Sequence, residues 1–213
     1  ERFISARPRR GGGKGFDVVS ASGDAALRLI FGKNVQPVNV SLIPAYADIM
    51  PELKEPAFNT VKGVHYGVSY EWGPNVLMWN SKSVKDAPTS WAAIYDKVYA
   101  GAITVPDNPI QIADAALYLA HTKPELGISD PYELTQVQMD AVVALLKEQR
   151  ALVKKYWALA SDEVDLFKSG DARIGAAWPY QANTPRTVGH VVIDSITLQR
   201  EIAWPETFVD RSS

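Results

Sequence analysis

Short runs of apolar residues alternate along the chain with longer stretches in which apolar positions recur at helical spacing. The short runs are rich in β-branched or small side chains and are bounded by glycine, proline, serine or asparagine, which is typical of strands. The strands expected from this pattern are Phe16–Ser20, one ending at Tyr70, Asn75–Asn80, Ala102–Val105 and Arg173–Ala177. Trp72-Gly73 forms the corner between the second and third of them.

The stretches with helical spacing lie between these strands. Ser22 or Asp24 can cap a first helix that Gly32 ends, and Pro109 stands in the first turn of a second helix that runs to about Ala120. The longest helix is expected from Thr135 to about Trp157. Shorter helices are expected at Ala45–Met50, at Ser90–Lys97, from Ser161 to Gly170 and after Pro179. This alternation of strands and helices predicts α/β architecture.

Composition narrows the class of protein. An apolar content of 46% and a charged content of 22% in 213 residues are those of a globular protein with one good core or two small ones. A net charge of -2 predicts no nucleic-acid partner, because neutralising phosphates requires clustered basic residues. The absence of cysteine excludes disulfides, thiolate catalysis and cysteine-based zinc sites, and it leaves the cellular compartment open.

Both ends of the sequence lack the pattern of its middle. Residues 1–14 are basic and glycine-containing without periodicity, and we expect a disordered arm there with no signal peptide. From about Pro185 the strand and helix pattern is lost, so residues 185–213 are an unrecognised tail. We expect a fragment or a frame-disrupted copy of a longer protein.

Two places in this pattern suit ligand binding. Ser22 and Asp24 flank a helix N-terminus, where unpaired N–H groups favour an anion, although a plain helix cap is the alternative. Asp107 follows a strand of the second half, at the kind of edge where ligands of open α/β sheets gather, and a carboxylate there can pair with an amine. Its alternative is again a helix cap.

Aromatic residues could add cation–π contacts to an amine. Trp178 ends a buried strand, and Tyr180 follows it closely. A core position is the alternative for Trp178, and Trp72 is a second candidate wall. His65, His121 and His190 lie far apart without the spacing of metal ligands, so we expect no metal, cofactor or catalytic group.

The segment His65–Trp91, HYGVSYEWGPNVLMWNSKSVKDAPTSW, carries the most specific pattern. It contains a strand, a Trp-Gly turn, a strand ending in asparagine and a Ser-Trp helix start, and it is followed by a strand to Asp107 and by DARIGAAW at Asp171–Trp178. In this order the motifs resemble the extracytoplasmic solute-binding proteins of ABC transporters, most closely the spermidine/putrescine-binding-like family. The resemblance covers about Gly15 to Asn183.

The resemblance implies roles for several residues. Ser22 falls on a ligand-contacting serine, whereas Asp24 falls where polyamine binders carry an aromatic residue. Asp107 falls on an aspartate that contacts the amino group of the ligand, and Trp178 on a tryptophan of the ligand cleft. Ile110 stands where that family has a second acid, which suits a ligand with fewer amines.

The expected fold is therefore α/β, of the two-lobed periplasmic-binding-protein type II kind, truncated at both ends. Lobe 1 would be partial and comprise residues 15–79, and lobe 2 would comprise residues 80–184. The expected function is capture of a small amine, either a polyamine or an amino acid, between two lobes, for delivery to an ABC permease at the membrane. A monomer, if complete, in the periplasm or another extracytoplasmic space is implied. An enzyme on a similar scaffold and a fragment that binds nothing are the alternatives.

Overall fold

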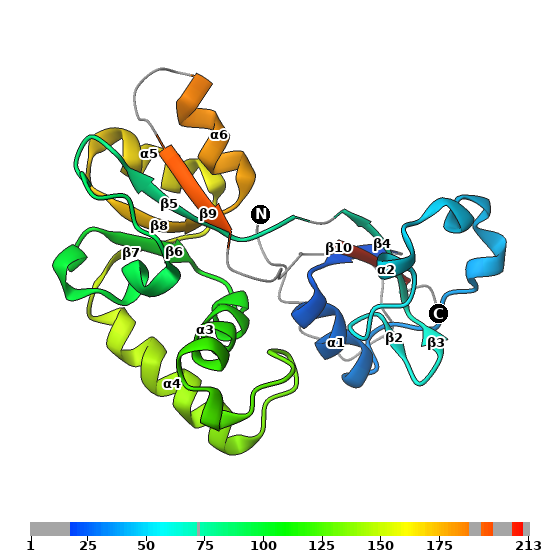
Figure 1. The fold of residues 1–213 in the computed structure, drawn as a ribbon. Helices are drawn as coiled ribbons and strands as arrows, with labels where there is room; N and C mark the ends of the chain where they lie inside the picture. Colours follow the sequence, from blue (N-terminus) through cyan, green and yellow to red (C-terminus); the bar gives the residue numbers. More distant parts are fainter. Residues whose placement is uncertain (1–17, 72, 188–192, 198–205, 211–213) are drawn as a thin grey trace, which may run out of the picture. The chain divides into compact units, whose positions relative to one another are not determined.

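The structure is a computed structural model, and it describes residues 18–71, 73–187, 193–197 and 206–210. The chain divides into two compact units, which we treat separately (Figure 1). The larger unit contains the described residues from Pro74 to Thr197. The smaller unit contains those from Val18 to Gly73 together with residues 206–210.

Within the described residues, the larger unit is built on a five-stranded sheet with the strand order β7-β6-β8-β5-β9. Its strands are β5 (Val76–Asn80), β6 (Ile103–Pro106), β7 (Val153–Trp157), β8 (Ile174–Ala177) and β9 (Ile193–Thr197). Strands β7, β6 and β8 are parallel, whereas β5 is antiparallel to both of its neighbours. Strands β6 and β8 confirm the strands expected at Ala102–Val105 and Arg173–Ala177.

Both faces of this sheet are covered, which explains why β5, β6 and β8 read as continuous apolar runs. On one face Leu77 and Trp79 of β5 pack with Trp91 and Ile94 of a short 3₁₀ helix (Trp91–Tyr95). On the other face Val76 and Met78 pack with residues that include Phe167, Ala172 and Ala182. The helices that supply part of this second cluster are α5 (Ala160–Ser169) and α6 (Pro179–Thr187).

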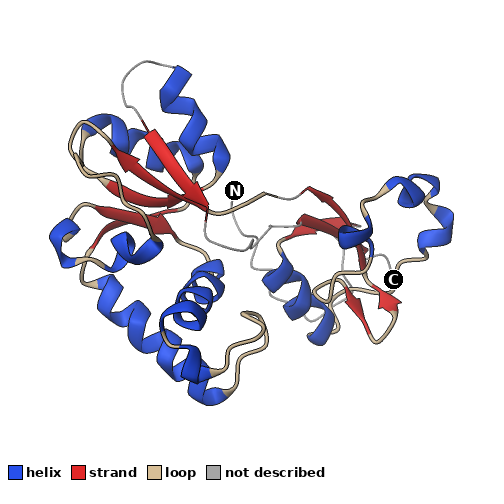
Figure 2. Ribbon diagram, in the orientation of Figure 1, coloured by secondary structure: helices blue, strands red, loops and turns tan. Residues whose placement is uncertain are grey.

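Helices α3 (Ile110–Thr122) and α4 (Gln136–Arg150) pack against each other through a third apolar cluster centred on Ala116, Leu119 and Val142 (Figure 2). A capping box starts α4: the Thr135 hydroxyl accepts the Gln138 N–H, and the Gln138 side chain accepts the Thr135 N–H. Short 3₁₀ turns at Lys97–Tyr99 and Pro124–Leu126 complete the connections.

The end of α4 differs from the sequence-based expectation. A single helix from Thr135 to about Trp157 was wrong, because the helix ends at Arg150 and Val153–Trp157 is the edge strand β7. No glycine or proline separates the two elements, so the helical spacing of apolar residues continues from α4 into β7 and predicts one helix. Pairing of β7 with β6 overrides the local pattern, and the β-branched and aromatic residues of VKKYW are compatible with that pairing.

The smaller unit contains a three-stranded antiparallel sheet, ordered β1-β10-β4, and a two-stranded one, β2-β3, among the described residues. Its strands are β1 (Val18–Ala21), β2 (Thr60–Val61), β3 (Val64–His65), β4 (Gly67–Glu71) and β10 (Glu206–Asp210). The helices α1 (Gly23–Phe31) and α2 (Pro51–Lys54) and the 3₁₀ helices Val40–Leu42 and Pro44–Asp48 lie between them in the chain.

The structure places the division between units at Gly73 and Pro74, whereas the sequence suggested residues 79 and 80. The stretch 185–213, read from sequence as an unrecognised tail, contributes β9 to the larger sheet and β10 to the smaller one. The basic stretch 1–14 lies outside the described residues. No helix in the described part of the chain is long and apolar enough to cross a membrane.

Candidate ligand-binding site

Three neighbouring parallel strands of the larger unit end at one edge of the sheet. Pro106 at the end of β6 pairs in register with Trp157 at the end of β7, and β8 runs parallel on the other side of β6. Asp107 and Trp178 are the residues that follow β6 and β8. The topology therefore brings Asp107, Trp157 and Trp178 to the carboxyl edge of the sheet, where α/β proteins bind their ligands.

The carboxylate of Asp107 is not used as a helix cap. The Asn108 Oδ1 atom accepts the Ile110 N–H at 3.0 Å, and the Asp107 N–H donates to the Trp157 carbonyl oxygen at 2.8 Å. Asp107 is exposed, and no basic group in the described part of the chain forms an ion pair with it. Its charge is therefore available to a ligand, and the cap explanation applies to Asn108 instead.

Trp178 stands on a second tryptophan. The rings of Trp157 and Trp178 meet edge to face, with centroids 4.8 Å apart and planes at 87°. Trp157 is the core residue of the pair: it is 2% exposed, and its indole N–H donates to the Ala176 carbonyl oxygen at 3.2 Å. Trp178 is half-buried at this edge of the sheet.

A buried acid lies behind these tryptophans. Glu163 of α5 is fully buried, and no donor in the described residues makes a hydrogen bond of good geometry to either carboxylate oxygen. Burial raises the pKa of Glu163 well above its usual range, and its polar neighbours, the Gln181 amide and the Trp157 indole, oppose that rise. Burial therefore favours the neutral carboxyl group over the carboxylate.

Gln181 connects this buried acid to Trp178. It is completely buried, and its Oε1 atom accepts the backbone N–H of Trp178 at 3.2 Å. The amide nitrogen of Gln181 has no hydrogen-bond partner in the described structure. Glu163 and Gln181 thus form a buried polar layer beneath the start of α6, and we infer that this layer sets the position of Trp178.

Glu163 was missed at the sequence level because Asp162 and Glu163 together resemble the acidic first turn of a helix. Capping does explain Asp162, whose Oδ2 atom accepts the Leu159 N–H at 3.4 Å. It does not explain Glu163, which points to the sheet instead: a Cβ atom on Gly175 would lie 2.5 Å from the Glu163 Oε1 atom. The glycine in GAAW was the available signal for a side chain approaching the strand.

The remaining candidates lie elsewhere. Tyr180, in the first turn of α6, is 63% exposed. Ser22 is the residue before α1 in the smaller unit; it is 6% exposed, and its hydroxyl does not cap the helix. Asp24 lies in the first turn of α1, and its side chain is outside the described part of the structure, as is the whole of Trp72. The edge of the larger sheet therefore brings together Asp107 and Trp178, while Ser22 belongs to the other unit.

No group of three histidine, aspartate or glutamate side chains in the described residues has the arrangement of a metal site. The chemistry of this edge is that of a carboxylate beside an aromatic face, which suits a cation.

Comparison with known families identifies the chain. A sequence model of the family described as bacterial extracellular solute-binding protein matches residues 15–207. The chain belongs to this family. The match confirms the resemblance read from the motifs at His65–Trp91, and it includes β9 and the start of β10.

Solved structures similar to this solute-binding protein have the same fold. The TpPotD lipoprotein of Treponema pallidum superposes with a TM-score of 0.74 at 20% identity, over 95% of this chain and 61% of that one. PotD, the spermidine/putrescine ABC transporter substrate-binding protein of Streptococcus pneumoniae, superposes with a TM-score of 0.62 at 17% identity. That match covers 93% of this chain and 58% of PotD. The protein described as the Atu4243-GABA receptor superposes with a TM-score of 0.66 at 20% identity. That match covers 92% of this chain and 56% of that one.

The expected periplasmic-binding-protein fold is thereby confirmed at the level of architecture. This solute-binding protein spans about 60% of the length of the solved structures that it matches.

Proposed function

We propose that this chain is the solute-binding component of an ABC importer and that it captures a small amine, delivering it to a permease outside the cytoplasm. The observation that carries the proposal is the exposed Asp107 carboxylate, which has no ion-pair partner in the described structure, at the same sheet edge as the half-buried ring of Trp178. A ring face over an ammonium contributes roughly 0.5–2 kcal/mol, and the carboxylate supplies the counter-charge. The mechanism is binding rather than catalysis.

The ligand class within the amines follows from what stands next to Asp107. Ile110, at the position of the second acid of polyamine binders, is 2% exposed, so its side chain packs inside and offers no charge. A single acid suits a ligand with one ammonium. Ser22, beside the N-terminus of α1, remains our candidate for receiving a carboxylate, and Asp24, Trp72 and Tyr180 remain candidates for further contacts. We therefore favour an amino acid such as 4-aminobutyrate over spermidine.

Calorimetry tests the proposal with 4-aminobutyrate, putrescine and spermidine in parallel titrations. We expect 4-aminobutyrate to bind most tightly. Asp107→Asn should weaken the binding of any of the three amines by roughly 100-fold or more, because an enclosed ammonium left without its counter-charge costs about 3–5 kcal/mol. Asp86→Asn is the matched control, since Asp86 is also an exposed acid and lies elsewhere in the larger unit.

Three results would count against the proposal in different ways. Tight spermidine binding with no response to 4-aminobutyrate would refute the amino-acid class but keep the amine site. Equal losses in Asp107→Asn and Asp86→Asn would remove Asp107 from the site. No measurable heat of binding for any of the three amines would refute the proposed ligand class itself.

A further inference from the structure

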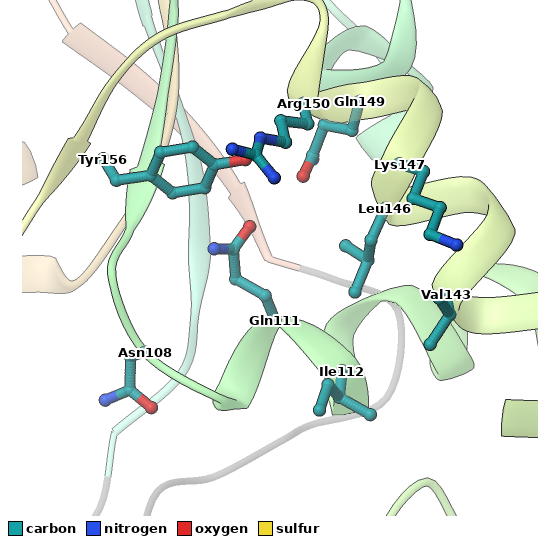
Figure 3. Close-up of a pocket in the computed structure, with 9 residues that line it drawn as sticks. All are labelled: Asn108, Gln111, Ile112, Val143, Leu146, Lys147, Gln149, Arg150 and Tyr156. Atoms are coloured by element: carbon teal, nitrogen blue, oxygen red, sulfur yellow. The ribbon is translucent and has the colours of Figure 1, made fainter.

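A separate pocket of about 330 Å³ opens in the larger unit between α3, α4 and the edge strand β7 (Figure 3). Its apolar wall comes from Ile112 of α3 and from Val143 and Leu146 of α4. This volume is that of a small-molecule site, and such sites combine mostly apolar walls with a few polar groups. No aspartate or glutamate lines the pocket, so the charged side chains that line it are cations.

Two cations lie at this pocket. Lys147 and Arg150 line it from the last turn of α4, and neither has a carboxylate partner within 4.0 Å in the described structure. Basic side chains near a helix C-terminus interact favourably with the helix dipole, which accounts for their position in the sequence. A buried amide that also lines the pocket lies between them in the sequence.

That amide belongs to Gln149. The residue is 2% exposed and lines the pocket. Figure 3 shows its side chain directed, with those of Arg150 and Tyr156, into the space above Gln111. Its amide therefore adds a polar group, with both donor and acceptor atoms, to the wall of the pocket.

Further donors face the same space. The Tyr156 phenol stays protonated, because burial raises its pKa and the nearby Asp107 raises it further, against the lowering effect of Arg150. Asn108 uses its Oδ1 atom to accept the Ile110 N–H, which leaves its NH₂ group as a donor. Gln111 is already engaged, since its amide nitrogen donates to the Pro106 carbonyl oxygen.

We infer that this pocket is a binding site for a small organic anion, a monocarboxylate with an aliphatic body. The carboxylate pairs with Arg150, beside Gln149 and Tyr156, and the hydrocarbon lies on Ile112, Val143 and Leu146. The site differs from the proposed amine site in its residues and in the sign of its charge. Asp107, which neighbours Tyr156, belongs to the amine site and does not line this pocket.

Hexanoate is the probe, and hexylamine of the same length and opposite charge is its control ligand. Titration of the full chain, followed by ¹H–¹⁵N correlation spectra, should give a dissociation constant of about 1 mM or tighter for hexanoate. The shifts should concentrate on the Gln149 side-chain amide and on the backbone of Arg150 and Tyr156. Hexylamine should produce none of these shifts.

Arg150→Gln removes the charge at an exposed position and should weaken hexanoate binding by about tenfold or more, since hydrogen bonds to charged groups are the stronger ones. Lys168→Gln is the matched control, because Lys168 also stands in the last turn of a helix, α5, and does not line the pocket. Gln149→Glu places a negative charge in the pocket and should have the same effect as Arg150→Gln.

The inference is overturned if hexanoate causes no shifts at about 20-fold the expected constant, if hexylamine binds as well, or if Arg150→Gln binds like the unchanged chain. None of these readouts requires an amine ligand, so the result stands whether or not Asp107 binds amines.

Discussion

Asp114 gives the larger unit a stability that depends on pH. This residue of α3 is 3% exposed; its Oδ1 atom accepts the Asn75 side-chain N–H at 2.7 Å, and its Oδ2 atom has no partner in the described structure. Burial raises the pKa of Asp114 from 3.8 to about 7, and the Asn75 hydrogen bond only partly opposes this. Tyr95, whose own pKa is raised by burial and by the Asp114 charge, stacks on Tyr118 close by.

The direction of the pH dependence follows from the pH at which each state releases the Asp114 proton. The unfolded chain releases the Asp114 proton near pH 3.8, whereas the folded chain keeps it until about pH 7. The stability that this proton supports is fully present below pH 3.8 and is lost as the pH rises through 7. A rise in pKa of this size corresponds to a total loss of about 4 kcal/mol, of which roughly 2–3 kcal/mol falls between pH 5 and pH 8.

Asp114→Asn removes this dependence, because the amide is neutral at every pH and can still pair with Asn75. We expect the free energy of unfolding of the variant, relative to the unchanged chain, to rise by about 2–3 kcal/mol between pH 5 and pH 8. Urea denaturation at several pH values, followed by tryptophan fluorescence, measures it, since the buried Trp79, Trp91 and Trp157 all report on this unit.

Asp86→Asn serves as the control, because an exposed acid should leave the pH dependence unchanged. Parallel curves for Asp114→Asn and the unchanged chain would show that Asp114 titrates normally and that the reasoning is wrong.

Three further predictions concern the same unit. Gly175→Ala should lower the free energy of unfolding by about 1–3 kcal/mol, because the new Cβ atom would lie 2.5 Å from Glu163 and 3.0 Å from atoms of Phe167 and Thr104; an unchanged urea midpoint would contradict it. Glu163→Gln keeps a polar side chain of the same size and should keep the near-ultraviolet circular dichroism of the tryptophans, whereas Glu163→Leu should alter it; identical spectra for both would remove Glu163 as a positioning residue. Hydrogen exchange should be slower in β6 and β8, which are fully buried, than in the largely exposed β1. Equal protection of these strands would refute the view that the larger unit is the more stable one.

The sequence predicts the parts of this fold that depend on local pattern. The apolar runs of β5, β6 and β8 identify buried strands, and the position of Asp107 after a strand correctly places it at the sheet edge. The boundary between α4 and β7 was missed because it is set by pairing with β6, which no local signal at Ala151 or Leu152 announces.

The residues missed at the site and in the pocket have a common cause. Glu163 reads as a helix-start acid, and only the packing of α5 against Gly175 shows that it is buried. Asn108 lies just before α3 and Gln149 lies in α4, and they line one pocket because α3 and α4 pack side by side. A single sequence does not specify that packing, and the alternation of apolar positions along α4 is the same whether the pocket exists or not.

The order of strands in the smaller sheet has a consequence for how the chain folds during synthesis. Strand β10 lies between β1 and β4, with Val18 paired to Asp210 and Ser69 to Thr207. The two early strands have no hydrogen-bonded contact with each other in this sheet, so they stay unpaired until the ribosome has released the last of the three. The larger sheet, whose strands all precede β10, can assemble first. The nascent chain thus carries two unpaired strand edges until β10 has been made, and such edges are prone to misassociation.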